Sequence, residues 1–462
     1  MDKGGTVMWW RRSLLGLVLS SAVVCGVTSE VRAASLRDKV DTLFGDQGIK
    51  LVAASPHAAH FSSDSFATLG NLVGGLAANA ADFNVVSTTP GFAYRYNPDL
   101  KVFERSPGSL GPVFAERAET VGQGVLDVGM SYLYVDYSTL NGDSLSGLSF
   151  RTTHSPVTAA PGVDTSFTKD TVDLTFTKFN LTSQVFSFYG TYGITDRWDV
   201  NLLVPVVYTT LDLRGHGMIN RISGATFMGK PVHSFPQAGA GVKCASTNPG
   251  VDDQCEASDR GDHFGVGDIL VRTKYRLTDG PGFNYAAGLV LRLPSGSQDD
   301  FQGLGDTTVE PLFVASRQFE LPWDVLRGPH DFHLNLGVEA NTGDVNRSRG
   351  RYAIGLTTQL TKVAAFYTDV IGSSGLTNQD VSTTVPTFPE QFPCIPPSCQ
   401  PDKSNGTETR TSSFRTDIVD LALGFKEEVL SKTTIFAGVV VPLNRDGLRA
   451  DVIPTTGVEL AF

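Results

Sequence analysis

The 462-residue chain combines 41% hydrophobic residues with only 18% charged residues and contains 48 glycines. Its formal net charge of -11 argues against a nucleic-acid-binding protein and against a polybasic protein that binds a membrane surface. The length allows about two or three soluble domains or one large β-barrel. The composition favours the barrel, because membrane strands expose an apolar side chain only at every second position.

The N-terminus has the pattern of an export signal. Arg11 and Arg12 precede an apolar run over residues 14–27, and Val31-Arg32-Ala33 resembles a small-residue cleavage site. We therefore predict a signal peptide over residues 1–33. No later stretch reaches 18 uninterrupted apolar residues, so a mature protein that enters a membrane would have to do so as a closed barrel.

Residues 34–118 do not alternate like membrane strands. Residues 35–44 predict a short amphipathic helix that Ser35 can cap, because Leu36, Val40 and Leu43 share a face. The following stretch, residues 66–86, is rich in alanine and glycine and could not form a core alone. We predict that residues 34–118 fill the barrel lumen as a plug; the alternative is a periplasmic segment.

From Glu119 the pattern changes to alternating segments of about ten residues, the length of a tilted membrane strand. In the first segment Leu126 and Val128 fall on one face, and Asp127 and Gly129 on the other. About twelve such strands are predicted, over residues 124–137, 171–192, 199–213, 265–277, 283–293, 307–319, 330–342, 349–360, 363–372, 412–426, 433–442 and 450–462. The fold class predicted for residues 119–462 is therefore all-β, a transmembrane antiparallel β-barrel.

The connections between these strands alternate in length. Short connections are expected at residues 194–198, 278–282, 320–329, 360–362 and 427–432. Mostly longer ones are expected at residues 138–170, 214–264, 294–306, 343–350, 373–411 and 444–448. Outer-membrane barrels have short periplasmic turns and longer extracellular loops, so the alternation indicates an even strand number with both termini on the periplasmic side.

Four cysteines follow the signal peptide, in two pairs that are close in sequence. Cys244 and Cys255 fall in the first of two long loops, and Cys394 and Cys399 in the second. An exported protein folds in an oxidising compartment, so two local disulfides outside the cell are predicted. A zinc site is the alternative, although no His flanks either pair at ligand spacing.

The last strand ends the chain on an aromatic residue. Val458, Leu460 and Phe462 share one face, and Glu459 and Ala461 the other. This pattern resembles the closing strand of bacterial outer-membrane barrels, whose terminal Phe is read by the barrel-assembly machinery. We expect Phe462 to be that signal. The alternative is a buried last strand of a soluble sandwich.

Several runs resemble one known family, namely residues 111–122, 192–200, 267–270 with Lys274-Tyr275, 288–296 and 442–449. The family they resemble is the outer-membrane proteins associated with the meta-pathway of phenol degradation. The family is described as transporters similar in build to fatty-acid-transporter barrels, and the resemblance covers residues 111–462. It departs in the loops at 214–263 and 373–411. The resemblance implies an outer-membrane channel.

If the apolar face of each strand meets lipid, the opposite face meets the lumen. The ionisable side chains predicted there are Asp268, Arg272, Lys274, Arg276, Arg292, Glu310, Asp331, His333, Glu339, Arg351, Asp420 and Glu459. They could form a structural network of ion pairs, because a lone charge in a partly dry lumen is costly. They could also form a polar constriction that selects what passes.

No catalytic site, cofactor or metal site is predicted. Asp331, His333 and Glu339 share a strand, but side chains two residues apart are neighbours on any inward face, and His333 lies near the predicted periplasmic end. His57 and His60 lack an acidic or Cys partner in register and are interpreted as loop residues.

The predicted function is passive uptake of small apolar solutes, aromatic ones among them, across the outer membrane of a Gram-negative bacterium. The expected partners are these solutes, outer-membrane lipid and the barrel-assembly machinery, and no nucleic acid. Two alternatives remain. The lumen charges could line a general diffusion pore, or the long loops could serve a structural or adhesive barrel.

Overall fold

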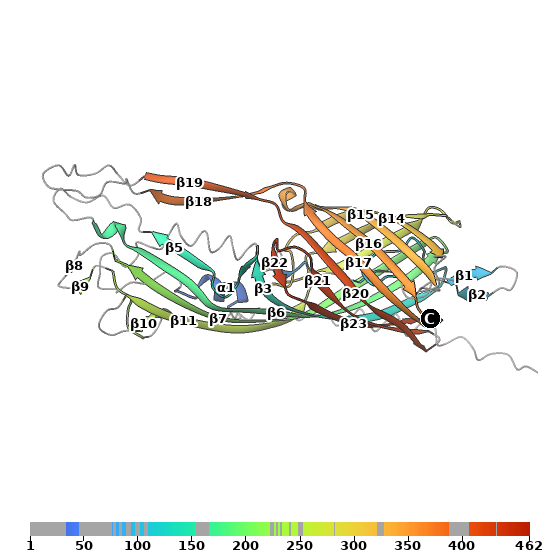
Figure 1. Ribbon diagram of the computed structural model, residues 1–462, viewed down its shortest axis with the longest axis horizontal. Helices are drawn as coiled ribbons and strands as arrows, with labels where there is room; N and C mark the ends of the chain where they lie inside the picture. Colours follow the sequence, from blue (N-terminus) through green and yellow to red (C-terminus); the bar gives the residue numbers. More distant parts are fainter. Residues whose placement is uncertain are drawn as a thin grey trace, which may run out of the picture. The chain divides into compact units, whose positions relative to one another are not determined.

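The computed structural model describes residues 34–45, 76, 80–82, 86–88, 94–97, 102–105, 110–153, 166–221, 226–227, 230–231, 233–239, 242–247, 253–280, 282–320, 328–387, 406–430 and 432–462. The predicted signal peptide, together with His57 and His60, lies outside these residues. Nearly all of the described elements are strands (Figure 1). None of the described helices has both the length and the hydropathy of a membrane span.

Twelve antiparallel strands form a closed barrel, which confirms the predicted fold class and strand number. They are β3 (Leu126–Leu140), β6 (Thr171–Thr195), β7 (Trp198–Asn220), β12 (Ile269–Arg276), β13 (Asn284–Leu293), β14 (Thr308–Glu320), β15 (Pro329–Asn341), β16 (Arg349–Gln359), β17 (Ala364–Gly375), β20 (Asp417–Leu430), β21 (Thr433–Pro442) and β23 (Ile453–Ala461). Each pairs with the next, and β23 returns to β3.

The seam between the last and the first strand closes the barrel. Thr455 to Ala461 pair in register with Leu133 to Asp127. At the end of the seam the N–H of Phe462 donates to the carbonyl oxygen of Leu126 at 2.8 Å, and the N–H of Leu126 donates back at 3.2 Å. The chain end is therefore part of the wall, while the Phe462 side chain itself is exposed.

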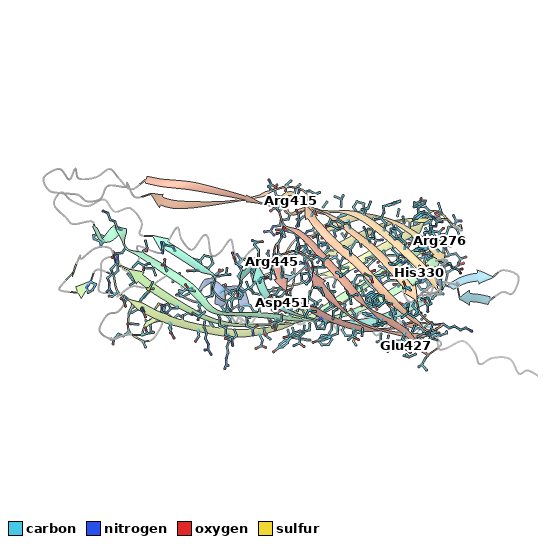
Figure 2. The ribbon with its side chains drawn as sticks, in the orientation of Figure 1. Arg276, His330, Arg415, Glu427, Arg445 and Asp451 are labelled. Atoms are coloured by element: carbon cyan, nitrogen blue, oxygen red, sulfur yellow. A yellow bond between two sulfur atoms is a disulfide. The ribbon has the colours of Figure 1, made fainter. Side chains whose placement is uncertain are left out.

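Two rims can be distinguished by the length of the connections. At the short-turn end, Asp196 and Arg197 alone join β6 to β7, and four residues join β16 to β17. At the long-loop end, connections such as the one between β17 and β20 span tens of residues. Figure 2 shows Arg276, His330 and Glu427 toward the short-turn end and Arg415, Arg445 and Asp451 toward the long-loop end.

The outward face of the barrel strands is apolar. Mid-strand positions expose Leu289, Leu336 and Ile354, each by more than two fifths of its surface. Exposed aromatic side chains gather where strands reach the short-turn end, at Tyr192, Trp198, Tyr275, Tyr285, Phe425 and Phe462. An apolar band bordered by aromatic residues is the surface that a membrane barrel presents to lipid and to the lipid headgroups.

Tight packing on the inward face requires glycines at a few wall positions. The ring of Tyr189 on β6 lies over Gly129 of β3, and a Cβ atom there would come within 2.4 Å of Tyr189 Cζ. On the other face of β6, a Cβ atom at Gly190 would meet nothing closer than 3.8 Å. The aromatic ring thus fills space that a larger residue at position 129 would occupy.

One part of the wall continues beyond the other strands. The first residues of β7 pair with β12, but residues 206–218 pair instead with β11 (Gln254–Val266), and β6 pairs with β7 along nearly all of its length. Strands β11 and β12 are separated only by Gly267 and Asp268, where the Gly267 N–H donates to the carbonyl oxygen of Pro205. We call β6, β7 and β11 the extended wall; Figure 1 shows them running side by side.

Helix α1 (Leu36–Asp41) packs on the extended wall and confirms the predicted helix. Ser35 caps it, with its hydroxyl accepting from the Asp38 N–H and Asp38 accepting from the Ser35 N–H. Leu36, Val40 and Leu43 are buried in a hydrophobic cluster with residues of β6, β7 and β11. The first described residues of the chain are therefore fixed toward the long-loop end.

The predicted extents of two long loops were wrong. The region expected as a loop over residues 214–264 begins inside β7 and ends inside β11, and the region over residues 373–411 contains β18 (Gln379–Thr387) paired with most of β19 (Gly406–Phe414). Strands β11, β18 and β19 carry polar residues on both faces. They therefore lack the alternation by which membrane strands are recognised in a sequence.

Smaller elements complete the described structure. Strands β4 (Asp143–Ser144), β5 (Ser149–Thr153), β10 (Ala245–Ser246) and β22 (Leu448–Ala450) join the main sheet. Two separate hairpins are β1 (Tyr94–Asn97) with β2 (Val102–Arg105) and β8 (Thr226–Phe227) with β9 (Lys230–Pro231). Two short 3₁₀ helices are η1 (Ser166–Lys169) and η2 (Val345–Arg347).

Candidate functional site

The lumen near the short-turn end is occupied by residues 110–121, which we call the inner segment. The inner segment forms no strand, and wall side chains accept hydrogen bonds from its backbone. The N–H groups of Phe114 and Ala115 both donate to Oδ2 of Asp369 on β17, at 2.9 and 3.3 Å. An unpaired backbone N–H is costly to bury, so a segment without strand partners needs acceptors from wall side chains. These hydrogen bonds hold the segment in place.

Neighbouring strands continue this arrangement around the wall. Asn335 of β15 accepts from the N–H of Glu116 and donates to its carbonyl oxygen, both at 2.7 Å. Ser316 of β14 and Asp199 of β7 accept from two later N–H groups of the segment, at 2.9 and 3.0 Å. The inner segment therefore follows the wall from β17 to β7 before it enters β3.

His333 belongs to this layer of polar residues. Its ring is 1% exposed, and Nδ1 lies 3.0 Å from the hydroxyl oxygen of Ser316, which in turn binds the inner segment. Asp331 on the same strand is also buried. These contacts give His333 a role in positioning Ser316.

Toward the long-loop end, three arginines converge on a carboxylate of the N-terminal chain. Asp82 accepts hydrogen bonds from Arg349 Nη1 and Arg351 Nη2, both at 2.6 Å, and from Arg292 Nη2 at 3.4 Å. Both of its carboxylate oxygens are used, and its side chain is 6% exposed. Asp82 is thus bound by cations from two strands, β13 and β16.

The same arginines also pair with carboxylates of the wall. Arg351 Nε lies 2.5 Å from Glu339 Oε2 and 4.0 Å from Glu310 Oε2, and Arg292 Nε lies 3.6 Å from Glu339 Oε1. We call Arg292, Arg349, Arg351, Glu310 and Glu339 the arginine cluster. The wall therefore supplies three guanidinium groups and two carboxylates, and the N-terminal chain supplies the third carboxylate.

Glu116 makes a second set of ion pairs. Its carboxylate lies 3.4 Å from Lys274 Nζ and 3.8 Å from Arg272 Nη1, and it accepts from the N–H and hydroxyl of Thr88 at 2.6 and 2.7 Å. Arg272 also donates to the carbonyl oxygen of Val86 at 2.8 Å. Two of the predicted lumen cations therefore bind the N-terminal chain.

The surrounding cations keep both N-terminal carboxylates ionised. Burial raises the pKa of Asp82, but the guanidinium groups of Arg351, Arg349 and Arg292 outweigh burial and hold the pKa well below its usual range. Burial likewise raises the pKa of Glu116. The positive charges of Lys274 and Arg272 and the hydrogen bonds from Thr88 outweigh burial and lower the pKa below its usual value.

A cavity of ≈ 200 Å³ lies against the arginine cluster. Its lining includes the charged side chains of Asp82, Arg292 and Arg351. It also includes apolar side chains, among them Leu133, Val135, Ile371 and Ile453, from β3, β17 and β23. The cavity therefore offers both an ionic and a hydrophobic surface to a small molecule.

Two predicted lumen residues lie away from this cavity. Asp268, between β11 and β12, accepts from the N–H groups of Gly296 and Leu304 at 3.1 and 2.8 Å and so fastens the connection between β13 and β14. Arg276 lies at the short-turn end, where it donates to the carbonyl oxygen of Asp196 at 3.0 Å and lies 3.7 Å from Asp279.

Two others form ion pairs with cations that the sequence analysis did not single out. Asp420 of β20, which lines the cavity, pairs with Arg449 of β22. Glu459 of β23 lies 2.9 Å from Lys426 Nζ and accepts a hydrogen bond from the hydroxyl of Tyr189 at 3.3 Å. Both pairs are buried and join strands of the same barrel wall.

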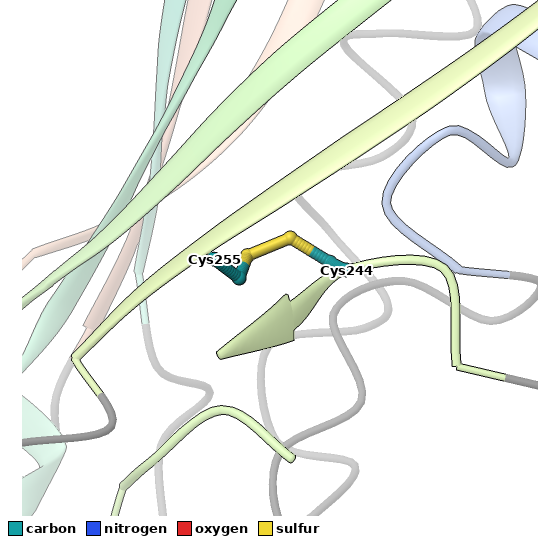
Figure 3. The surroundings of a disulfide bond; sticks show 2 residues. All are labelled: Cys244 and Cys255. Atoms are coloured by element: carbon teal, nitrogen blue, oxygen red, sulfur yellow. A yellow bond between two sulfur atoms is a disulfide. The ribbon is translucent and has the colours of Figure 1, made fainter. Parts of the chain in front are cut away.

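A disulfide joins Cys244 and Cys255, as Figure 3 shows, with 5.3 Å between their Cα atoms. It fastens the stretch before β10 to β11 of the extended wall. Cys394 and Cys399 lie outside the described residues, and their pairing stays a prediction. Among the described residues, no group of three or more His, Cys, Asp or Glu side chains is placed to hold a metal ion.

The sequence analysis missed the N-terminal partners of the lumen cations. Asp82 stands alone as an acidic residue after a run of alanines, and Glu116 lies in a run noted for its family resemblance. Arg349 shares the inward face with Arg351 and could have been found from that spacing. The two carboxylates could not, because nothing in their local pattern shows which wall residue they meet.

Comparisons with known proteins find barrels of low sequence identity. No protein-family model and no curated protein matches the chain. Similar solved structures include the COG4313 outer membrane channel from Pseudomonas putida F1, with 12% identity, 75% of this chain and 98% of that chain covered, and a TM-score of 0.38. The Ralstonia pickettii toluene transporter TbuX has 12% identity, 74% and 89% coverage, and a TM-score of 0.22. The translocator domain of the Neisseria meningitidis autotransporter NalP has 8% identity, 74% and 89% coverage, and a TM-score of 0.23.

Proposed function

We propose that the chain is an outer-membrane channel for the passive uptake of small, largely apolar solutes, aromatic ones among them. The observation that carries this proposal is a closed barrel with an apolar outer face that encloses a partly apolar cavity. An exposed apolar surface of this extent is unfavourable in water and favourable in lipid. Export by residues 1–33 and recognition of Phe462 by the assembly machinery belong to the same proposal.

The N-terminal chain would restrict the channel in this proposal. The inner segment and Asp82 are bound to inward side chains of seven barrel strands, so residues 34–118 act with the barrel as a plug. A narrow, partly apolar route favours small organic solutes over hydrated ions and sugars. The polar residues of the inner face serve first as ligands of the plug and second as a filter.

A general diffusion pore is the second candidate, because charged residues are part of the cavity lining. Uptake of labelled toluene and phenol by cells with and without the gene, together with planar-bilayer conductance, separates the two. We expect gene-dependent uptake of the aromatic compounds and small conductance. Large steady conductance without any effect on aromatic uptake would favour the pore, and the absence of both signals would favour a structural or adhesive barrel.

A further inference from the structure

The arginine cluster already holds a carboxylate in the geometry that a ligand would need. Guanidinium groups bind carboxylates through directed, charge-assisted hydrogen bonds. Asp82 receives such bonds on both oxygens, from Arg349 and Arg351 at 2.6 Å and from Arg292 at 3.4 Å. Asp82 comes from the N-terminal chain and not from the barrel, so it is the one carboxylate of this group that the wall itself does not provide.

The cavity next to Asp82 limits the size and chemistry of the rest of a ligand whose carboxylate binds the arginines. Its volume of ≈ 200 Å³ is somewhat larger than the roughly 150 Å³ of an engineered protein cavity that binds benzene. Apolar side chains of β3, β17 and β23, among them Val135, Ile371 and Ile453, line the cavity together with the charged ones. One aromatic ring with a short polar substituent therefore matches its size and its mixed lining.

We propose that the arginine cluster is a binding site for the carboxylate of a single-ring aromatic acid, and that Asp82 is the resident competitor which this ligand replaces. This inference rests on the proposed channel function and names a substrate class within it. The carboxylate of the ligand takes the place of Asp82 against Arg349 and Arg351, and the ring lies against the apolar side chains that line the cavity. Neutral aromatic solutes use the same cavity without displacing Asp82.

The Asp82→Asn variant tests the competition directly. It removes the competing charge and keeps the size of the side chain, so it should tighten benzoate binding to the detergent-purified full chain at least about tenfold. Binding of benzamide, which has the same shape without the charge, should stay within about twofold. The matched control is Glu119→Gln, which makes the same change of charge at a residue outside the cavity lining.

A second variant covers the case in which Asp82→Asn does not fold, as judged by its band on unboiled gels. Arg349→Gln should change benzoate binding and leave benzamide binding unchanged, because Asp82 and the charged ligand, but not benzamide, compete for Arg349. The proposal is overturned if benzoate and benzamide respond alike in every folded variant. If toluene uptake persists in that case, the carboxylate site alone is wrong; if wild-type cells show no gene-dependent uptake either, the channel function is wrong as well.

Discussion

Polar side chains on the inward face of this barrel act mainly on the backbone of another part of the same chain. Asp369, Asn335 and Ser316 bind successive groups of the inner segment, whose N–H groups would otherwise be buried without partners. Each is therefore tied to the segment by a specific contact. At the residue scale, an inward charged or amide side chain of a barrel can bind another segment of the same chain as readily as it can select solutes.

Inward aromatic residues can pack against the wall only where the neighbouring strand has a glycine, as Tyr189 does over Gly129. Gly129→Ala would bring a Cβ atom within 2.4 Å of the ring of Tyr189, which is buried and donates a hydrogen bond to Glu459. We expect Gly129→Ala to lower the free energy of unfolding by about 1–3 kcal/mol. Urea unfolding in lipid vesicles measures this loss.

The control for that substitution lies on the neighbouring strand. Gly190→Ala meets no atom closer than 3.8 Å, so the free energy of unfolding should stay the same or rise slightly, because alanine restricts the unfolded chain. Equal losses in the two variants would show that glycine flexibility, and not the space under Tyr189, matters at position 129.

At the scale of elements, the sequence predicted the twelve barrel strands because each has one apolar face that lipid selects. Strand β21, for example, was predicted over residues 433–442 and has those bounds in the structure. Strand β11 was missed because it carries polar residues on both of its faces. Asp82 and Glu116, the N-terminal partners of the lumen cations, were missed for a different reason: such contacts depend on how two distant segments meet in space.

The depth of an outward position should set the cost of placing a charge there. Ile354 lies in the middle of β16 and is exposed on the outward face, so Ile354→Arg should cost about 2–4 kcal/mol of folding free energy in vesicles. Leu460 lies two residues from the end of the chain, near the short-turn rim, and Leu460→Arg should cost only about 0–1 kcal/mol. Equal costs would contradict a membrane that spans the middle of the barrel strands.

At the scale of the whole molecule, continuous hydrogen bonding around the barrel predicts resistance to detergent. No strand of the closed ring of twelve has an unpaired edge at its centre, so unfolding requires the whole ring to open. The unboiled protein should therefore run at a different position from the boiled protein on detergent gels, and it should be recovered with the outer membrane. A heat-independent band and recovery in the soluble periplasmic fraction would refute the membrane barrel.

The two ends of the N-terminal chain are fixed to opposite ends of the barrel, and this has a consequence for the order of assembly. Helix α1 is anchored on the extended wall toward the long-loop end, while the inner segment is bound near the short-turn end just before β3. Pulling this chain through a finished barrel would break the ion pairs of Asp82 and Glu116 one after another. We therefore expect Asp82 and the inner segment to bind the wall before β23 joins β3, so that closing the seam encloses them.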